Sequence, residues 1–336
     1  MLDHTFDIDG RTLGGNEKPY FIAEAGSNFN QDMDTAKRLI DVAAKAGADA
    51  VKFQLFQADV LQSPGTKLHD IFKSIQLNPD WVPQLATHAK SMEITFLASP
   101  FDEDMVDVLI EAGAPALKVA SSETTKMGLL TYMASKKIPL LLSTGMCDYV
   151  DVFEAVQACK RAGNSQVALM QCVSVYPLPP EQANLRVMDA FRRDFGGVIG
   201  YSDHALGLTS CIAAAARGAQ VIEKHITLDR SSDGPDHFYA IEPDELTELI
   251  KQVNIAHDML GERDKFMLPD EIKYGRRVGL IAKVDILPGD VISHNILDTT
   301  TPAHGIRERY RPNVIGYKAV KAIPAGEPLQ WDDIEP

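Results

Sequence analysis

Residues 20–55, YFIAEAGSNFNQDMDTAKRLIDVAAKAGADAVKFQL, contain the pattern that decides the fold. The short apolar run at 20–26 is typical of a buried strand. Apolar residues recur at helical spacing over 33–46, and Gly47 follows them, which predicts an amphipathic helix that ends at the glycine. A second apolar run at 50–55 predicts another strand. Strands that are connected through a helix run parallel to each other.

The same unit recurs along the chain. Further helix-like segments, such as residues 102–112, are followed by a glycine in the same way, at Gly113, Gly163, Gly218 and Gly261. Strand-like runs occupy residues 20–26, 50–55, 94–99, 116–120, 138–143, 167–173, 197–201 and 220–225. Eight strand–helix units in about 240 residues match a (β/α)8 TIM barrel, an α/β fold. A doubly wound sheet is the alternative, but no GxGxxG turn follows the first strand.

The sequence changes character after the last barrel unit. Residues 266–277 are mostly polar and are expected to form a linker. An internal repeat follows, because ILPGDVI (286–292) is echoed by IPAGEPL (323–329). Pro and Gly between short apolar runs predict a small β-rich module with two similar halves. We therefore expect a barrel domain over residues 1–265, including a lead-in at 1–19, and a β-rich domain over 278–336.

Composition narrows the class of protein. Hydrophobic residues make up 45% and charged residues 24% of the chain, which is ordinary for a globular protein with a large core. The formal net charge of −14 argues against nucleic acid and an anionic membrane surface as partners. We find no signal-peptide pattern, no membrane-length apolar run and no CxxC among the four cysteines. We expect a cytoplasmic protein.

Polar residues stand at the ends of most predicted strands, where a TIM barrel places its active site. These ends carry Glu24, Lys52, Gln54, Ser99, Lys118, Ser121, Glu123, Ser143, Thr144, Ser174, Tyr176, Ser202, Asp203, His204, Glu223, Lys224 and His225. A single polar residue at a strand end says little, because strand ends also border solvent. Groups of both charges converging on one small face indicate a binding or catalytic site, since a lone buried charge is expensive.

His204 and His225 end the seventh and eighth strands, so we expect them to lie side by side. Two neutral imidazoles can chelate a divalent ion whose other ligands are water and substrate. The alternative is that one histidine is a hydrogen-bonded core residue. Two further residues, Cys147 and Cys172, are expected to pack in the core, because no neighbour in the sequence clearly lowers a thiol pKa.

Lys52 and Lys118 end the second and fourth strands among several hydroxyls, an arrangement that suits phosphate or carboxylate. The alternative is a Schiff-base lysine, which needs a lowered ammonium pKa. We expect Glu24 and Glu123 to lie close and raise that pKa, which favours phosphate binding. Asp236 lies in the turn-like segment DGPDH (233–237), where it can reach a hydroxyl-rich substrate.

Together with the C-terminal repeat, these residues resemble the sialic acid synthase family. The matching motifs are FIAEAGSN (21–28), VKFQ (51–54), LKVASSE (117–123), LLSTGM (141–146), YPLP (176–179), IGYSDH (199–204), VIEKHIT (221–227) and GPDH (234–237). The C-terminal module resembles that family's antifreeze-like (SAF) domain. The resemblance covers residues 18–336 in order. It implies condensation of phosphoenolpyruvate with an N-acyl-mannosamine-type sugar, giving a nine-carbon 2-keto-3-deoxy acid and phosphate, with a divalent metal (Mn²⁺, or else Mg²⁺).

The resemblance also implies roles for the site residues. It places the metal on His204 and His225. It places phosphoenolpyruvate among Lys52, Lys118, Ser99, Ser121, Ser143 and Ser202. It turns Glu24, Gln54, Tyr176 and Asp236 towards the acceptor sugar or a metal-bound water, and makes Glu123 a general acid or base. The predicted catalytic residues are Glu24, Glu123 and Asp236, and Ser174, where the family usually has Asn, is a further substrate-binding residue.

The departures from the family concern the acceptor sugar. The family's Arg-Pro-Gly-x-Gly-Ile reads TPAHGI here (301–306), so Thr301 replaces an arginine that Arg307 or Arg309 would have to supply. Asn-His-Asn-Gly after the first strand reads NFNQ (28–31). We expect N-acetylmannosamine or a di-acylamino-dideoxy hexose as acceptor. The family's SAF domain caps a partner's barrel, which implies a domain-swapped homodimer. The alternative functions are a class I aldolase with Lys118 as Schiff base and a silent glycan-binding barrel.

Overall fold

The computed structural model describes residues 1–336, apart from the side chain of Tyr274. The chain divides into two compact units, Met1–Gly261 and Glu262–Pro336, and each unit is described by itself. The segment expected to be a linker contains a short helix, α11 (Pro269–Tyr274). In the described part of the chain, no helix combines the length and the apolar character needed to cross a membrane. All four cysteines are free.

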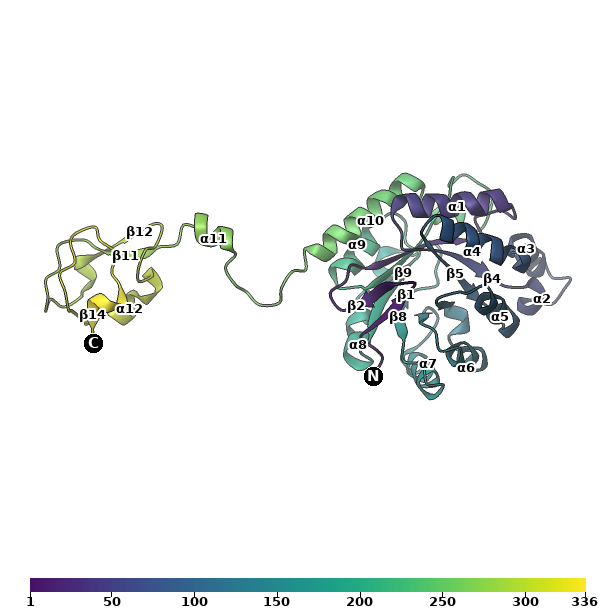
Figure 1. Cartoon of the computed structure of the whole chain (residues 1–336), viewed down its shortest axis with the longest axis horizontal. Coiled ribbons are helices and arrows are strands. Elements are labelled where there is room, and N and C mark those ends of the chain that lie inside the picture. Colours follow the sequence, from purple (N-terminus) through teal and green to yellow (C-terminus); the bar gives the residue numbers. More distant parts are fainter. The chain divides into compact units, whose positions relative to one another are not determined.

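The first unit is a barrel of eight parallel strands (Figure 1). These are β3 (Tyr20–Gly26), β4 (Ala50–Leu55), β5 (Thr95–Pro100), β6 (Leu117–Val119), β7 (Leu140–Ser143), β8 (Val167–Cys172), β9 (Val198–Asp203) and β10 (Val221–His225). The strand order is β5-β4-β3-β10-β9-β8-β7-β6, and the two end strands lie against each other. The predicted TIM barrel is therefore confirmed.

Helices follow the strands and surround the barrel (Figure 1). They are α1 (Met33–Ala46), α2 (Ala58–Leu61), α3 (Lys67–Ile75), α4 (Val82–Ser91), α5 (Glu103–Glu111), α6 (Met127–Ser135), α7 (Tyr149–Arg161), α8 (Val187–Asp194), α9 (Thr209–Ala216) and α10 (Pro243–Asp258). Helix α1 shows why they begin and end where they do. The Asp32 side chain accepts a hydrogen bond from the Thr35 backbone, and Gly47 ends the helix at a φ of 85°.

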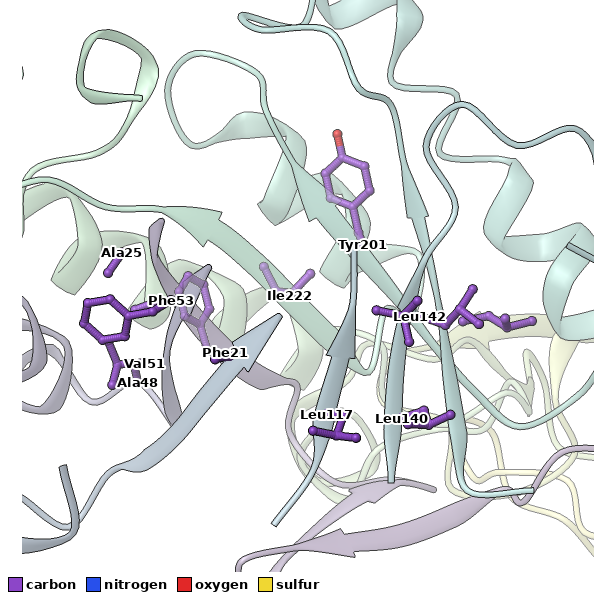
Figure 2. Close-up of a cluster of buried hydrophobic side chains, with 14 of the residues drawn as sticks. Phe21, Ala25, Ala48, Val51, Phe53, Leu117, Leu140, Leu142, Tyr201 and Ile222 are labelled. Atoms are coloured by element: carbon purple, nitrogen blue, oxygen red, sulfur yellow. The ribbon is translucent and has the colours of Figure 1, made fainter. Parts of the chain in front are cut away.

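Alternate residues of each strand face two separate cores, because side chains along a strand point to opposite sides in turn. Phe21, Val51 and Phe53 belong to the layer between strands and helices, as do Leu117 of β6 and Leu140 and Leu142 of β7 (Figure 2). Their neighbours Ile22 and Ala50 belong to a second cluster that fills the barrel interior. The next residues that face the barrel interior lie two positions further along each strand, towards its carboxyl end. These are the positions that carry the polar residues.

The lead-in at 1–19 forms an antiparallel hairpin of β1 (Thr5–Ile8) and β2 (Arg11–Gly14). Its buried side chains Phe6, Ile8 and Leu13 join the interior cluster together with Tyr20 and Val198, which begin β3 and β9. The hairpin therefore closes the amino-terminal end of the barrel. The carboxyl ends of the strands remain as the end at which a ligand can enter.

The second unit is a small β-rich domain, as predicted. Its elements are β11 (Gly279–Ala282), β12 (Leu297–Thr300), α12 (Arg311–Val314), β13 (Lys318–Ala319) and β14 (Ile334–Glu335). The two copies of the repeat pair with each other, because Ile286 and Ile323 exchange backbone hydrogen bonds of 2.9 Å in both directions. Gly289 and Gly326 make the same turn in each copy, with φ of 92° and 87°.

Candidate active site

A cavity of about 520 Å³ lies at the carboxyl end of the barrel strands. Every predicted site residue except Asp236 lines it: Glu24, Lys52, Gln54, Ser99, Lys118, Ser121, Glu123, Ser143, Ser174, Tyr176, Ser202, His204 and His225. Apolar side chains from the loops after β4 and β5, such as Phe56 and Phe101, form another part of the wall. Most of the strand-end residues that the sequence singles out therefore converge on one space, whereas Thr144, Asp203 and Lys224 do not line it.

Lys52 is the centre of a buried polar cluster. Its Nζ lies 2.7 Å from Glu24 Oε2 and donates to Ser99 Oγ at 3.2 Å. Gln54 donates to the other oxygen of Glu24 at 3.2 Å. Burial opposes the charged form of Lys52, but the carboxylates of Glu223 and Glu24 outweigh burial and raise its pKa. Lys52 is therefore a fixed positive charge in the cavity.

Lys118 lies in a different environment. Its Nζ donates to Ser143 Oγ at 2.7 Å and lies 3.6 Å from Glu223 Oε1. Burial lowers the pKa of Lys118, and repulsion from Lys52 adds to this against the attraction of Glu223. Glu24 does raise this pKa, but only as a minor contribution, so the expected net increase is wrong for Lys118. Glu123 is instead held by Lys126, with 2.6 Å between Oε2 and Nζ.

Glu223 is a cavity residue to which the sequence reasoning gave no role. Its Oε1 accepts a hydrogen bond of 3.0 Å from Ser202 and faces both lysines. Its buried Oε2 has no hydrogen-bond partner among the described residues. Strict alternation along β10 is the signal that could have found it, because His225 and Glu223 share one face and Lys224 lies on the other.

The two histidines lie side by side at the mouth of the barrel, with ring centroids 5.4 Å apart. His204 Nδ1 donates to the Val173 carbonyl at 2.7 Å, which leaves its Nε2 free to act as a ligand. Burial lowers the pKa of His225 well below its ordinary value, so its imidazole is neutral. No three His, Cys, Asp or Glu side chains in the described part of the chain converge to hold a metal. The neighbouring imidazoles of His204, with its free Nε2, and of His225, which is neutral, are a donor set that fits a divalent ion.

Asp236 lies behind His225 instead of on the cavity wall. It accepts a hydrogen bond of 2.8 Å from the Tyr239 hydroxyl, and its other oxygen lies 4.0 Å from His225 Nδ1. The Tyr239 oxygen also lies 3.4 Å from His225 Nδ1 and can accept its proton. A Cβ at Gly26 would stand 2.9 Å from the Asp236 carboxylate, so only glycine permits this approach. Asp236 reaches the site through Tyr239 and His225.

Serine hydroxyls and a tyrosine complete the polar wall. Gly145 donates its backbone N–H to Ser121 Oγ at 3.0 Å, and a Cβ at Gly145 would collide with the hydroxyls of Ser121 and Ser174. The half-exposed Tyr176 places its ring 4.1 Å from the ring of His204, measured between centroids. Because Gly145 has no side chain, the segment after β7 can approach Ser121 and Ser174 closely.

Cys172 lies on the cavity wall and is not only a packing residue. Its sulfur is 3.5 Å from Ser121 Oγ and 4.0 Å from His204 Nδ1. Burial alone would raise the pKa of Cys172, but His204 and Ser121 outweigh burial and lower it. The expectation that nothing near this cysteine lowers its pKa is wrong, because His204 is close in space and distant in sequence. Cys147 conforms to the expectation, since burial raises its pKa to about 11.

The two arginines that could replace the family's arginine differ in their surroundings within the second unit. Arg307 lines a cavity of about 650 Å³ together with Arg277 and His304. Arg309 stacks over the Tyr310 ring, with its guanidinium carbon 4.6 Å from the ring centroid. The Arg309 side chain is therefore held against the Tyr310 ring, whereas the Arg307 side chain lines a cavity.

Comparisons with known proteins show what the chain is similar to. A model of the NeuB family matches residues 39–265, and a model of the SAF domain matches residues 277–335. The chain is 35% identical to the N,N'-diacetyllegionaminic acid synthase of Legionella pneumophila, over 96% of each chain. It is 35% identical to the N-acetylneuraminate-9-phosphate synthase of Mus musculus, over 97% of this chain and 95% of the relative.

A solved structure is also similar. The N-acetylneuraminic acid synthetase of Leptospira borgpetersenii serovar Hardjo-bovis, crystallised with citrate, has a TM-score of 0.78 at 30% identity. The alignment covers 81% of this chain and 95% of that one. These matches confirm the resemblance drawn from the motifs, the C-terminal SAF domain and the expectation of a synthase of this kind.

The buried cluster predicts a large effect of Lys52→Met on stability. The change leaves the carboxylates of Glu24 and Glu223 without their shared cation, so we expect the free energy of unfolding to fall by about 3–5 kcal/mol. Urea unfolding followed by circular dichroism measures this. Lys136→Met is the matched control, because it breaks the partly exposed Lys136–Asp107 pair and should cost less than about 1 kcal/mol. Equal losses in the two variants would contradict the prediction.

Proposed function

Because this chain belongs to the NeuB family, we propose that it condenses phosphoenolpyruvate with an N-acyl-mannosamine-type sugar. The products are a nonulosonic (sialic-type) acid and phosphate. One observation carries the proposal: two buried lysines with serine hydroxyls face two imidazoles across one cavity. Lysines and hydroxyls suit the phosphate and carboxylate of phosphoenolpyruvate, and imidazoles suit a divalent metal.

The lysines would hold phosphoenolpyruvate. Lys52 donates a hydrogen bond to Ser99, and Lys118 donates one to Ser143. Each ammonium group and its neighbouring hydroxyl can therefore bind the same anionic oxygen. Ser121 and Ser202 bring further hydroxyls to the same wall. In a chain of net charge −14 this cluster is what attracts an anionic substrate locally.

His204 and His225 would hold a divalent metal, Mn²⁺ or Mg²⁺, through their Nε2 atoms. The Val173 carbonyl orients one ring, and Tyr239 with Asp236 orients the other. When bound, the metal polarises the aldehyde of the open-chain acceptor as a Lewis acid. Tyr176 stands next to His204 and is placed to contact the acceptor.

The chain's carboxylates then support the bond changes. The C3 carbon of phosphoenolpyruvate attacks the aldehyde carbon, and the aldehyde oxygen takes a proton to become a hydroxyl. Positive charge develops at C2, where the carboxylates of Glu24 and Glu223 stabilise it. Water adds to C2 and loses one proton, which leaves a hydroxyl and the phosphate group on the same carbon. The C2–O bond to phosphate then breaks, the phosphate takes the electron pair and the hydroxyl proton, and C2 becomes the carbonyl of the 2-keto acid.

Glu24 and Glu123 are the residues to which we assign the proton transfers. Burial raises the pKa of Glu24 and the attraction of Lys52 offsets this only in part, which brings the group closer to the working range of a proton carrier. Glu123 lines the cavity and is held in place by Lys126.

The first test is phosphate release from phosphoenolpyruvate with Mn²⁺. We expect release only when an acceptor is present, and loss of release with a chelator. N-acetylmannosamine and a di-acylamino-dideoxy hexose should be compared, because Ser174 and Thr301 stand where the family usually has Asn and Arg. Release without acceptor, or release that a chelator does not affect, would contradict the mechanism. No release with any acceptor would revive the silent glycan-binding barrel.

A class I aldolase is the second candidate, and the environment of Lys118 favours it. Burial and Lys52 lower the pKa of this lysine, which a Schiff base requires. For the synthase we expect no covalent adduct when the protein is treated with pyruvate or substrate and borohydride, and intact-mass spectrometry measures this. An adduct that disappears in Lys118→Met would overturn the synthase in favour of the aldolase.

We also propose that the chain forms a homodimer in which each SAF domain covers the partner's barrel. Large apolar side chains stand exposed on the loops after the strands, among them Met146 (69% exposed), Leu206 (61%) and Phe238 (50%). Exposed apolar groups gathered at one end of a domain indicate an interface.

The oligomeric state tests this proposal. We expect sedimentation equilibrium to give twice the mass of the chain, and the double variant Leu206→Asp/Phe238→Asp to shift the equilibrium towards monomer, since buried charges oppose association. The control is Met92→Asp, which lies before β5 at the other end of the barrel and should leave the mass unchanged. A monomeric wild-type protein would rule the dimer out.

A further inference from the structure

Asp203 and Lys224 precede the two histidines by one residue each, and the mechanism uses neither of them. Both are buried, each with a relative exposure of 1%. His204 and His225 line the cavity, but Asp203 and Lys224 do not. Alternation along β9 turns Asp203 to the same side as Tyr201, whose ring lies in the layer between strands and helices (Figure 2).

The two charged residues form one rung between the two strands. Lys224 and Asp203 are direct partners in the parallel register of β9 and β10. Lys224 Nζ lies 2.7 Å from Asp203 Oδ2. The ion pair therefore joins the strands at the position immediately before each histidine.

The same pair also holds the backbone around His204. Asp203 Oδ1 accepts a hydrogen bond of 3.0 Å from the Ala205 N–H, and Lys224 Nζ donates to the Ala205 carbonyl. The His204 carbonyl accepts from the Leu178 N–H at 2.9 Å. The peptide groups on the carboxyl side of His204 are thus tied both to β10 and to the segment after β8.

Further donors complete the coordination of the Asp203 carboxylate. The Tyr201 hydroxyl donates to Oδ1 at 2.9 Å, and the Ser210 hydroxyl donates to Oδ2 at 2.6 Å. Ser210 belongs to α9, so the carboxylate also connects the strand end to the following helix. A group with this many fixed donors has little freedom to move.

Stability alone does not account for an ion pair in this layer. The desolvation of two charges commonly exceeds their mutual attraction, and well-packed apolar residues are often as stable or more stable in such positions. What an apolar pair cannot supply is directional contact with the Ala205 N–H and carbonyl. The ion pair therefore contributes the geometry of the strand ends, which an apolar pair could not fix.

We propose that Asp203 and Lys224 are a positioning pair that fixes the spacing and orientation of the His204 and His225 imidazoles and thereby sets the affinity of the metal site. This inference rests on the proposed function, because it requires that the two imidazoles bind a divalent ion. With only two protein ligands, the relative placement of the two rings is the main property that the protein controls at this site.

The test is direct Mn²⁺ binding to the substrate-free full chain, measured by electron paramagnetic resonance of the unbound ion. Asp203→Asn and Lys224→Met each remove the ion pair without touching a histidine. We expect the dissociation constant to rise about tenfold or more, the range seen when groups that orient metal ligands are changed. The absorption spectrum of bound Co²⁺ should change as well, because it reports ligand geometry.

The matched control is Asp49→Asn. Asp49 also forms an ion pair, with Arg11 at 3.2 Å, but it lies just before β4 at the closed end of the barrel. Its loss should lower stability without changing the dissociation constant for Mn²⁺. Circular dichroism and thermal unfolding verify that each variant is folded before binding is measured.

The outcomes separate this inference from the proposed function. If the wild type binds Mn²⁺ and both variants bind it equally well, the positioning role is overturned and the metal-dependent synthase stands. If the wild type binds no Mn²⁺, both are overturned. Should the single variants fail to fold, the double variant Asp203→Leu/Lys224→Met leaves no unpaired charge, and weakened binding in that folded protein supports the role while unchanged binding overturns it.

Discussion

The alternation of side chains along the barrel strands is the constraint on which the rest of this structure depends. It sends Phe21 and Phe53 to the helices and Ile22 to the barrel interior. At the carboxyl ends the same alternation brings Glu223 into the cavity and Lys224 to the opposite face. A shift of one residue in a single strand would exchange these two charges, and both the site and the apolar layer would lose their partners.

The site is a set of buried charges that compensate one another. Lys52 and Lys118 face Glu24 and Glu223 across distances of 2.7 to 3.8 Å. Such a cluster is tolerated inside a protein only when each charge is paired. In the proposed reaction, a substrate anion would take over contacts that the carboxylates make in its absence. Lys52, whose pKa is raised, would then already be charged and positioned when the substrate arrives.

Much of this could be predicted from the sequence, and the exceptions have physical reasons. The bounds of β3, β4 and α1 follow from local periodicity and a terminating glycine, so residues 20–26, 33–46 and 50–55 were predicted as observed. The position of Glu223 near a strand end does not by itself indicate a role. Only the alternation along β10 places it on the same side as His225. The position of Asp236 beside Gly26 and the lowered pKa of Lys118, which burial and Lys52 cause, depend on neighbours distant in sequence, which no local pattern reveals.

The β1–β2 hairpin closes one end of the barrel, so the barrel is open only at the carboxyl ends of its strands. Its apolar side chains fill the interior up to the start of the strands, so nothing passes along the barrel axis. In the proposed reaction, substrates would enter and both products would leave by the same opening. Passage of ligands through that one opening would then set an upper limit on turnover, independent of how fast the bonds are made and broken.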